Sequence, residues 1–568
     1  MKNTDKYERV IELGRRRGFF WPSYEIYGGA GGFLDYGPAG VALKRKIENK
    51  WRDLFLKRHG FLEIETPIIT PEKVFRASGH VEHFKDPMIE CKICKRVFRA
   101  DHLLRDLGVK NTESMTLKDL RNEFETRGTG CPECGGQLLE PRHMQTMFQT
   151  TIGPYTEAIA YGRPEAAQGI FVNFRRLFEV AREQFPIGVG QVGHALRNEI
   201  SPRQGPVRLR EFTIMEFEFF FDPEESQCPL LKDIQDVEIM VIPIQSRKEK
   251  SEEPLQMSLR DAVDRKVILV EWMAYFMGLS QQFIRELGIP QDKQRFLEKL
   301  PSERAHYSAQ TFDQEIYLDR WGWTEISGHA YRTSYDLSRH MDQSGVDNRV
   351  FRPYPRPIEV EEKRLVPDVD AIRKTFGDDF PKVMELVGAA DQRLLENALT
   401  EKGSYEIGGF TITQDHVKAK TLKRKETGKR IVPHVVEPSF GADRLVYSAM
   451  EYAYSIREDR VVLGLPKDIA PFQVVVLPLL TKSDLIEKAS KIYRMLLEAK
   501  IDTYYDEVGS IGRRYARADE IGVPLAVTVD HQTLTDGTLT VRHRDTWKQV
   551  RIGQTDLISH TRHFFDSK

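Results

Sequence analysis

Residues 196–223, with the sequence LRNEISPRQGPVRLREFTIMEFEFFFDP, constrain the fold more than any other segment of the chain. The pairs Ser201-Pro202 and Gly205-Pro206 break regular structure, and the residues that follow are rich in Phe, Ile and Leu. This pattern predicts a hairpin of two antiparallel strands, the second of them buried. Around the turn lie four arginines, Arg197, Arg203, Arg208 and Arg210. On this segment alone, a few solvated surface cations explain them as well as a binding site does.

The chain has 568 residues, which is too long for one core and predicts roughly three or four domains. Hydrophobic residues make up 40%, as in an ordinary globular protein. The first twenty residues are charged throughout, so they do not resemble a secretory signal. The most apolar run, VVVLPLL at 474–480, is too short to cross a bilayer. We therefore expect a cytoplasmic protein without a membrane segment.

The formal net charge is −1, so no global field indicates a nucleic-acid partner. This balance disfavours a protein that coats DNA or RNA non-specifically. Contact with RNA through local patches stays open.

Five cysteines form two C-x-x-C pairs, CKIC and CPEC, and one solitary residue, Cys228. Each pair can form a knuckle that gives two sulfurs to a tetrahedral ion, which predicts a structural zinc site. Its four thiolates would leave no open position for chemistry. A disulfide or a redox motif is the alternative, which a reducing cytoplasm disfavours. The predicted ligands are Cys91, Cys94, Cys131 and Cys134.

Several other segments have patterns that predict their secondary structure. A glycine-rich stretch at 19–40 lacks the G-K-[ST] of a phosphate loop and indicates a turn supported by aromatic residues. The spacing of apolar residues predicts a helix from about 41 to Gly60, followed by an extended segment to about residue 80 that suits a dimer surface. Residues 116–128 look helical, and residues 432–454 predict a strand, a turn and a helix. From 466 onwards strands and helices alternate, which predicts a separate α/β domain.

Taken together, these stretches resemble the class II aminoacyl-tRNA synthetases, and among them the dimeric glycyl-tRNA synthetases of archaeal and eukaryotic type. The segment 41–80 is similar to the first class motif, LRNEISPRQGPVRLREFTIMEFEFF to the second and EPSFGADRL to the third. WPSYEIYGGAGGFLDYGP and RPEAAQGIFVNF are similar to segments particular to the glycyl enzymes. The order and spacing of these motifs over nearly the whole chain make the resemblance specific.

The resemblance implies an α+β fold, with a six- or seven-stranded antiparallel sheet flanked by helices, a zinc-binding insert and a C-terminal anticodon-binding domain. The expected divisions are 1–85 (catalytic, with the dimer motif), 86–145 (zinc insert), 146–227 (catalytic, second motif), 228–320 (insertion), 321–359 (catalytic), 360–432 (insertion with the basic run KAKTLKRKETGKR), 433–465 (catalytic, third motif) and 466–568 (anticodon-binding).

The resemblance also assigns a nucleotide site, in which Arg197, Glu199 and Arg444 are the expected catalytic residues. Arg197 would hold the α-phosphate of ATP, Arg444 the far phosphate, and Glu325 a magnesium ion. Phe212 would stack on the base. The expected ATP-binding residues are Arg197, Asn198, Glu199, Val207, Arg208, Leu209, Arg210, Glu211, Phe212, Glu325, Ile326, Gly441 and Arg444.

For glycine, the resemblance implies three glutamates around the ammonium group and Ser439 beside the α-carbon. Relatives often carry Thr where this chain has Ala166, and the positions of His329 and Tyr331 vary in the family. The expected glycine-site residues are Arg99, Glu165, Phe212, Glu216, Arg332, Glu437, Ser439 and Gly441.

The activity implied is ligation of glycine to the 3′ end of tRNA(Gly), with ATP as substrate, Mg²⁺, a structural Zn²⁺ and a homodimer. A seryl, threonyl, prolyl or histidyl enzyme would share the nucleotide arginines but not the three glutamates. A non-catalytic relative, serving as an RNA-binding or polymerase-accessory subunit, is the alternative from another functional class. Such relatives typically lose the ATP-site arginines, whereas Arg197 and Arg444 are both present.

Overall fold

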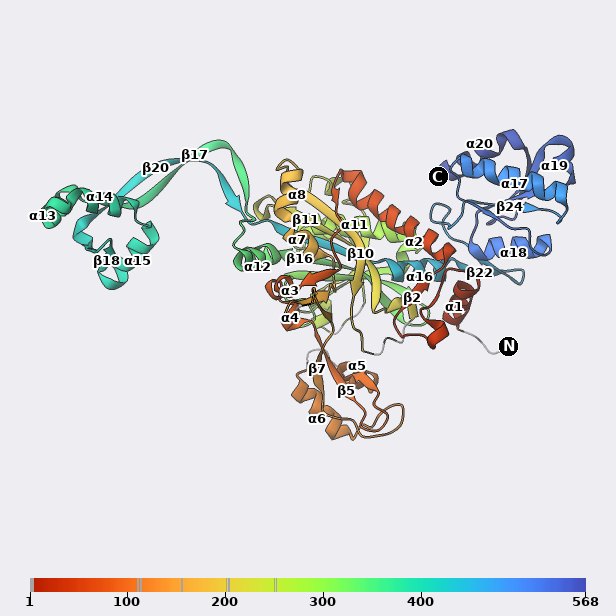
Figure 1. Cartoon of the computed structure of the whole chain (residues 1–568), viewed down its shortest axis with the longest axis horizontal. Helices are drawn as coiled ribbons and strands as arrows, with labels where there is room; N and C mark the ends of the chain where they lie inside the picture. The colour runs from red at the N-terminus through yellow and green to blue at the C-terminus, as the bar shows by residue number, and fades with distance from the viewer. Residues whose placement is uncertain are drawn as a thin grey trace. The chain divides into compact units, whose positions relative to one another are not determined.

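The computed structural model describes residues 5–567, except for 110, 111, 113, 114, 155, 156, 201, 203, 204, 250 and 252. Ser201 and Arg203 of the expected turn therefore lie outside the described residues. The chain divides into two compact units, Met1–Asn348 with Pro433–Lys568, and Arg349–Val432 (Figure 1). Each unit is described by itself.

A large sheet forms the centre of the first unit. Six consecutive strands of it are antiparallel, and parallel pairs extend the sheet on both sides of this run. In spatial order, the nine strands found in the described parts of the chain are β13 (Leu255–Ser258), β12 (Glu238–Ile242), β14 (Gln294–Glu298), β15 (Gln310–Leu318), β16 (Gly322–Thr333), β21 (His434–Gly441), β11 (Glu211–Phe221), β10 (Ile187–Leu196) and β3 (Leu62–Glu63). The mixed α and β composition and the antiparallel run agree with the expected fold class.

The predicted hairpin is confirmed by β10 and β11, which pair antiparallel from Ile187–Phe220 to Leu196–Glu211. Side chains of β11 alternate between the two faces of the sheet, as the period of two requires. Phe217 and Phe219 pack into the main core with Phe55 and Phe276. Glu216 and Glu218 are therefore on the opposite face, although both are buried.

Three long helices cover the core face of the sheet: α2 (Pro38–Trp51), α11 (Glu271–Glu286) and α16 (Ala442–Ala453). The predicted helix after residue 41 is α2, which begins at Pro38 and continues through a π turn and a 3₁₀ turn to His59. Gly60 ends it with φ of 68°, a backbone conformation that favours glycine. The strand and helix predicted for residues 432–454 are likewise confirmed by β21 and α16.

The expectation of an extended segment to residue 80 is wrong in its second half. After β4 (Ile69–Pro71), the chain forms the short helices α3 (Glu72–Ala77) and α4 (His80–His83). Phe75 of α3 is fully buried against Tyr161 and its neighbours, so tertiary packing outweighs the extended preference of a proline-containing segment.

Residues 86–145 carry a small core of their own. It packs α5 (Ala100–Asp106) and α6 (Leu117–Arg127) against β5 (Lys85–Glu90). The predicted helix is α6, which starts with a capping box between Thr116 and Asp119 and ends at Gly128. The insert can therefore fold around its own apolar residues, Ile89, Leu104, Leu120 and Phe124 among them.

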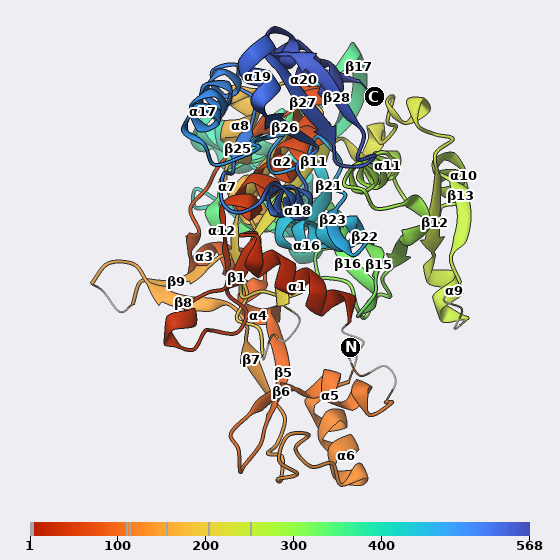
Figure 2. The ribbon, with the colours of Figure 1, turned by 90° about the vertical axis from the view of Figure 1, so that its right-hand side faces the viewer.

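Residues 228–320, expected as an insertion, form part of the central sheet. They supply β12, β13, β14 and β15, and α10 (Leu259–Asp264) lies with β12 and β13 at one edge (Figure 2). The sequence could not reveal this arrangement, because β15 pairs with β16 across a tight turn while β14 joins β12 in parallel over more than fifty residues.

The second unit begins at Arg349, eleven residues before the expected boundary at 360. It contains a long antiparallel ladder of β17 (Val350–Pro367) and β20 (Val417–Ile431). The basic run KAKTLKRKETGKR lies on β20. At the far end of the ladder, α13 (Val369–Phe376), α14 (Phe380–Ala389) and α15 (Gln392–Lys402) enclose a small apolar core.

The C-terminal residues form a five-stranded sheet. Its order is β25 (Thr503–Tyr505), β24 (Val474–Pro478), β26 (Leu525–Val529), β27 (Thr538–His543) and β28 (Gln549–Gly553). The first three strands are parallel and the last two add antiparallel, which confirms the predicted alternation and the terminal β pair. In the parts of the chain that the structure describes, no helix is both long and apolar enough to span a bilayer.

Candidate active site

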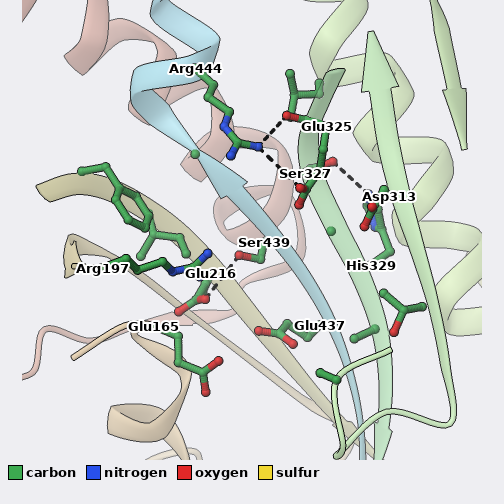
Figure 3. A pocket seen from close by; sticks show the side chains of 18 of the residues that line it. Glu165, Arg197, Glu216, Asp313, Glu325, Ser327, His329, Glu437, Ser439 and Arg444 are labelled. Carbon is green, nitrogen blue, oxygen red and sulfur yellow. Dashed lines mark hydrogen bonds and ion pairs between the residues drawn. The ribbon is translucent and has the colours of Figure 1, made fainter. Parts of the chain in front are cut away.

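A cavity of about 390 Å³ opens over β11, β16 and β21 on the face opposite the main core. It brings together two sets of residues that the sequence placed in separate motifs. Figure 3 shows the glutamates gathered at one end and Arg444 with Glu325 at the other. The expected site residues that line it are Glu165, Arg197, Glu199, Val207, Arg208, Leu209, Phe212, Glu216, Glu325, Ile326, Glu437, Ser439, Gly441 and Arg444.

The acidic end consists of Glu165, Glu216 and Glu437, all buried, with one carboxylate oxygen of each lying within 4.8 Å of the others. Glu165 comes from the loop before α7 (Ala167–Val172), Glu216 from β11 and Glu437 from β21. A primary ammonium group has three N–H donors, so it can satisfy one oxygen from each carboxylate. This end is suited to a small cation.

One buried arginine compensates part of this negative charge. Arg332, on β16, is fully buried and pairs with Glu437 at 2.7 Å, Asp336 at 2.8 Å and Glu165 at 3.4 Å. Its guanidinium also lies 3.6 Å from the centre of the Tyr307 ring. Arg332 is not among the residues that line the cavity, so it supports the glutamates from beneath.

The three glutamates have different electrostatic surroundings. Burial, together with the neighbouring Glu437 and Glu165 carboxylates, raises the pKa of Glu216 to about 8. Burial also raises the pKa of Glu437, against the lowering effect of Arg332. For Glu165 the effect of burial is outweighed by His80 and Arg332, which hold its pKa below the usual range. The proton of the cluster therefore belongs on Glu216.

Three expected arginines line the cavity: Arg208 and Arg444 form its basic end, and Arg197 lies beside Glu216, between the two ends (Figure 3). Arg197 donates to the carbonyl of Pro164 at 3.1 Å and lies over the ring of Phe212 at 5.2 Å. Arg444 donates to the carbonyls of Val207 at 2.7 Å and Glu325 at 2.6 Å. A carbonyl fixes an arginine without neutralising it, so the charge of Arg197 stays available to an anion. Arg444 also faces the carboxylate of Glu325.

Two carboxylates at this end are already paired. Arg208 contacts Glu199 at 2.6 Å, and the Glu325 carboxylate lies 3.6 Å from Arg444. The side chain of Glu325 is 46% exposed; partial desolvation in the cavity opposes its ionisation, but Arg444 and Lys299 hold its pKa below the usual value. Glu325 is therefore an ionised oxygen donor facing the cavity, the type of ligand that Mg²⁺ prefers.

Several expected site residues lie outside the cavity. Arg332 is beneath the glutamates, and Arg99 pairs with Asp101 at 2.6 Å and Asp86 at 3.2 Å in the insert. The other three lie in the turn or at its end. Asn198 donates its backbone N–H to the carbonyl of Thr146, and Arg210 donates to the carbonyls of Gly31 and Glu199. The carboxylate of Glu211, the first residue of β11, lies 3.3 Å from the His194 ring.

Sequence reasoning missed Lys299, Tyr307 and Asp313, which all line the cavity. Lys299 and Asp313 form an ion pair at 3.0 Å, and burial raises the pKa of Asp313 to about 7, with Glu325 adding to the effect. These residues lie in the stretch expected as an insertion. The alternation in QTFDQEIYL, which puts Asp313 on the face opposite the core residues Phe312, Ile316 and Leu318, was the available signal.

The departures from the family pattern have local explanations. Ala166 uses its backbone N–H, not its side chain, to donate to the Glu216 carboxylate. His329 is buried next to Ser327 at 3.2 Å, and burial lowers its pKa to about 3, so it is neutral. Tyr331 bonds His434 at 2.6 Å and does not line the cavity.

The four cysteines of the two C-x-x-C pairs converge in the insert. Their sulfurs all lie within 4.8 Å of one another, with Cys91 and Cys134 at 3.5 Å and Cys94 and Cys131 at 3.7 Å. A tetrahedral zinc ion with Zn–S bonds of about 2.3 Å sets neighbouring sulfurs about 3.8 Å apart. The cluster therefore fits zinc.

Comparison with known proteins places this architecture in a family. Residues 473–562 match the family described as "Anticodon binding domain". The glycine–tRNA ligase of Aeropyrum pernix is 49% identical over 566 residues, which cover 99% of this chain and 97% of the relative. Those of Pyrococcus horikoshii and Thermococcus kodakarensis are each 47% identical, with 97% and 98% of both chains covered. The chain belongs to the glycine–tRNA ligase family.

Proposed function

We propose that this chain activates glycine with ATP to glycyl-adenylate and pyrophosphate, and then transfers glycine to the 3′ end of tRNA(Gly). The observation that carries the chemistry is a single cavity with a buried acidic end and a basic end fixed by carbonyls. In glycyl-adenylate, the ammonium group of glycine is the cation that the acidic end would hold, and the nucleotide phosphate is the anion that the arginines would hold.

In the first step, a carboxylate oxygen of glycine attacks the α-phosphorus and pyrophosphate leaves. No side-chain nucleophile is needed, because the substrate supplies the attacking atom. The enzyme contributes position and charge: Glu165, Glu216 and Glu437 would hold the ammonium, while Arg197 and Arg444 would stabilise charge on the phosphates. Phe212, which lies against Arg197, would provide the face for the adenine ring.

Two metals would assist different parts of the chain. Glu325 would hold Mg²⁺, which supplies charge neutralisation on the phosphates when it is bound. Cys91, Cys94, Cys131 and Cys134 would hold a structural Zn²⁺ that stabilises the insert. Neither role requires a further protein nucleophile.

The same geometry explains selection of glycine. Ser439 Oγ donates to Glu216 at 3.3 Å, so the serine stands beside the proposed ammonium position. Every other amino acid carries at least a methyl group on the α-carbon, and rejecting a larger substrate needs only steric exclusion. Ser439 would occupy the space that this methyl group requires.

The anticodon-binding match supports tRNA recognition by the C-terminal sheet. Reading single-stranded bases relies on stacking and hydrogen bonds to exposed edges. The homodimer and the cytoplasmic location stay predictions from the sequence.

Glycine-dependent exchange of pyrophosphate into ATP tests the proposal. We expect exchange with glycine and little with alanine or serine, followed by charging of tRNA(Gly). A non-catalytic RNA-binding subunit would show no exchange. Its typical loss of ATP-site arginines is not seen, because Arg197 and Arg444 both line the cavity.

A further inference from the structure

The acidic end of the cavity holds more negative charge than its neighbours compensate. Five carboxyl groups meet there, and the buried cations beside them are Arg332 and Arg163. Charged and titratable groups surround Glu216 on all sides. The acids are Glu165 from the loop before α7, Glu218 from β11, Asp336 from α12 (Tyr335–Ser344) and Glu437 from β21. The basic groups are His80 from α4, Arg163 from the loop before α7, Arg197 at the cavity wall and Arg332 from β16.

The ion pairs in this cluster are unevenly shared. Arg332 pairs with Glu165, Glu437 and Asp336. Arg163 instead donates to the carbonyls of His194 and Thr66. Within the described residues, Glu216 forms no ion pair; it accepts from the Ala166 N–H and from the Ser439 hydroxyl. Glu216 is therefore the carboxylate of the trio without a cationic partner, although it is 2% exposed.

A buried carboxylate without a counter-ion is costly, and the usual resolution is protonation. Carboxylate oxygens of Glu437 and Glu165 lie within 4.8 Å of one on Glu216, so a proton between them relieves the repulsion. A substrate ammonium would bring the missing positive charge to the same place. The proton then has no further function in the cluster.

We propose that the empty pocket stores one proton on Glu216 and that glycine binding exchanges this proton for the substrate ammonium. The inference rests on the proposed function. The Glu216 carboxylic acid loses its proton to solvent and becomes a carboxylate, and the zwitterionic glycine binds with its ammonium intact. No other bond forms or breaks.

The exchange makes glycine affinity depend on pH in a defined direction. The raised pKa of Glu216, about 8 in the empty pocket, means that the proton must be removed below this value before the ammonium binds. The dissociation constant should therefore fall about 10-fold per pH unit between pH 6.5 and 7.5, and level off above about pH 8.5.

Isothermal titration of the full chain with glycine measures the exchange directly. The titration is repeated in buffers with different ionisation enthalpies, such as phosphate and Tris. The slope of the observed binding enthalpy against the buffer ionisation enthalpy gives the number of protons released. We expect about 0.9 proton per glycine at pH 7 and about 0.25 at pH 8.5, from the fraction of Glu216 protonated at each pH.

Three variants assign the proton. Glu216→Gln should bind glycine more weakly and without proton release, whereas Glu216→Asp, which keeps the acid, should release one. Glu218→Gln is the matched control, because Glu218 is a buried acid two residues along β11 that does not line the cavity; it should keep the release.

Glycine binding to the unaltered chain without proton release would overturn the inference and leave the proposed function standing. Release that persists in Glu216→Gln, or disappears only in Glu218→Gln, would also overturn it. Absence of both glycine binding and pyrophosphate exchange would instead contradict the proposed function.

Discussion

The two ends of the cavity carry opposite charges, and those charges are stabilised in different ways. At the acidic end, Glu165, Glu216 and Glu437 are buried around one fully buried arginine, Arg332. At the basic end, the Arg208 and Arg444 side chains keep 24% and 31% of their exposure. Solvent stabilises the basic end when it is empty, whereas the acidic end depends on protein groups and, by our proposal, on a proton.

This difference separates the contacts that stabilise the fold from those that bind substrate. Arg332 holds the acidic end together whether or not substrate is present, so its loss should damage folding. Arg197 and Arg444 are fixed by backbone carbonyls, and the one ion pair of Arg444, to Glu325, is partly exposed, so their loss should damage chemistry and spare the fold.

The largest expected effect is that of Arg332→Ala. Removing the shared cation leaves Glu165, Glu437 and Asp336 buried without their arginine, and breaking a buried ion pair typically costs about 3–5 kcal/mol in unfolding free energy. Urea unfolding measures the loss. It should be larger at pH 8 than at pH 5, because protonation relieves unpaired carboxylates as the pH falls.

The matched control is Arg320→Ala, which removes a partly exposed ion pair to Glu8 at 3.0 Å and should cost less than about 1 kcal/mol. Equal stabilities of the Arg332 and Arg320 variants would mean that the buried network is not essential to the fold.

Arg197→Ala should leave unfolding unchanged but slow adenylate formation by about two to three orders of magnitude, the usual cost of one fixed donor to a charged transition state. Pyrophosphate exchange at saturating glycine measures this step. Arg176→Ala, on the exposed face of α8 (Phe174–Val180), serves as the control and should exchange like the unaltered chain. Exchange in the Arg197 variant close to that of the control would refute its role.

How far the sequence predicts these ends depends on the kind of contact. Patterns local in the chain predicted the β10–β11 hairpin and helix α6, and the family resemblance named the three glutamates, Arg197, Arg444 and Arg332. The place of Arg332 beneath the glutamates and the positions of Lys299 and Asp313 were not predicted. These depend on pairing between β14, β15 and β16, and hydrophobic alternation does not reveal which strands become neighbours.

A smaller effect, on the choice between glycine and alanine, is expected from Ser439 in the cavity wall. Ser439→Gly removes the side chain beside Glu216 and should let alanine support exchange, with a gain of roughly 10-fold, since a methyl group is worth about 1–3 kcal/mol of discrimination. The ratio of kcat/KM for alanine to that for glycine is the quantity to measure. An unchanged ratio would show that another group excludes the methyl.

The smallest effect on the cavity should come from the zinc insert. We expect one zinc ion per chain, and Cys131→Ser should reduce the metal content and loosen the insert. Because the insert has its own core, glycine activation should stay near the original rate while tRNA charging falls. Metal analysis that finds no zinc in the unaltered chain would contradict the assignment, as would loss of activation equal to loss of charging.

The most direct test of the two-ended cavity is a crystal structure of the full chain with a non-hydrolysable glycyl-adenylate analogue. We expect the ammonium nitrogen to lie within about 3.2 Å of oxygens from Glu165, Glu216 and Glu437, and the phosphate mimic to face Arg197. An ammonium bound away from these glutamates, or a phosphate mimic away from Arg197, would contradict this expectation.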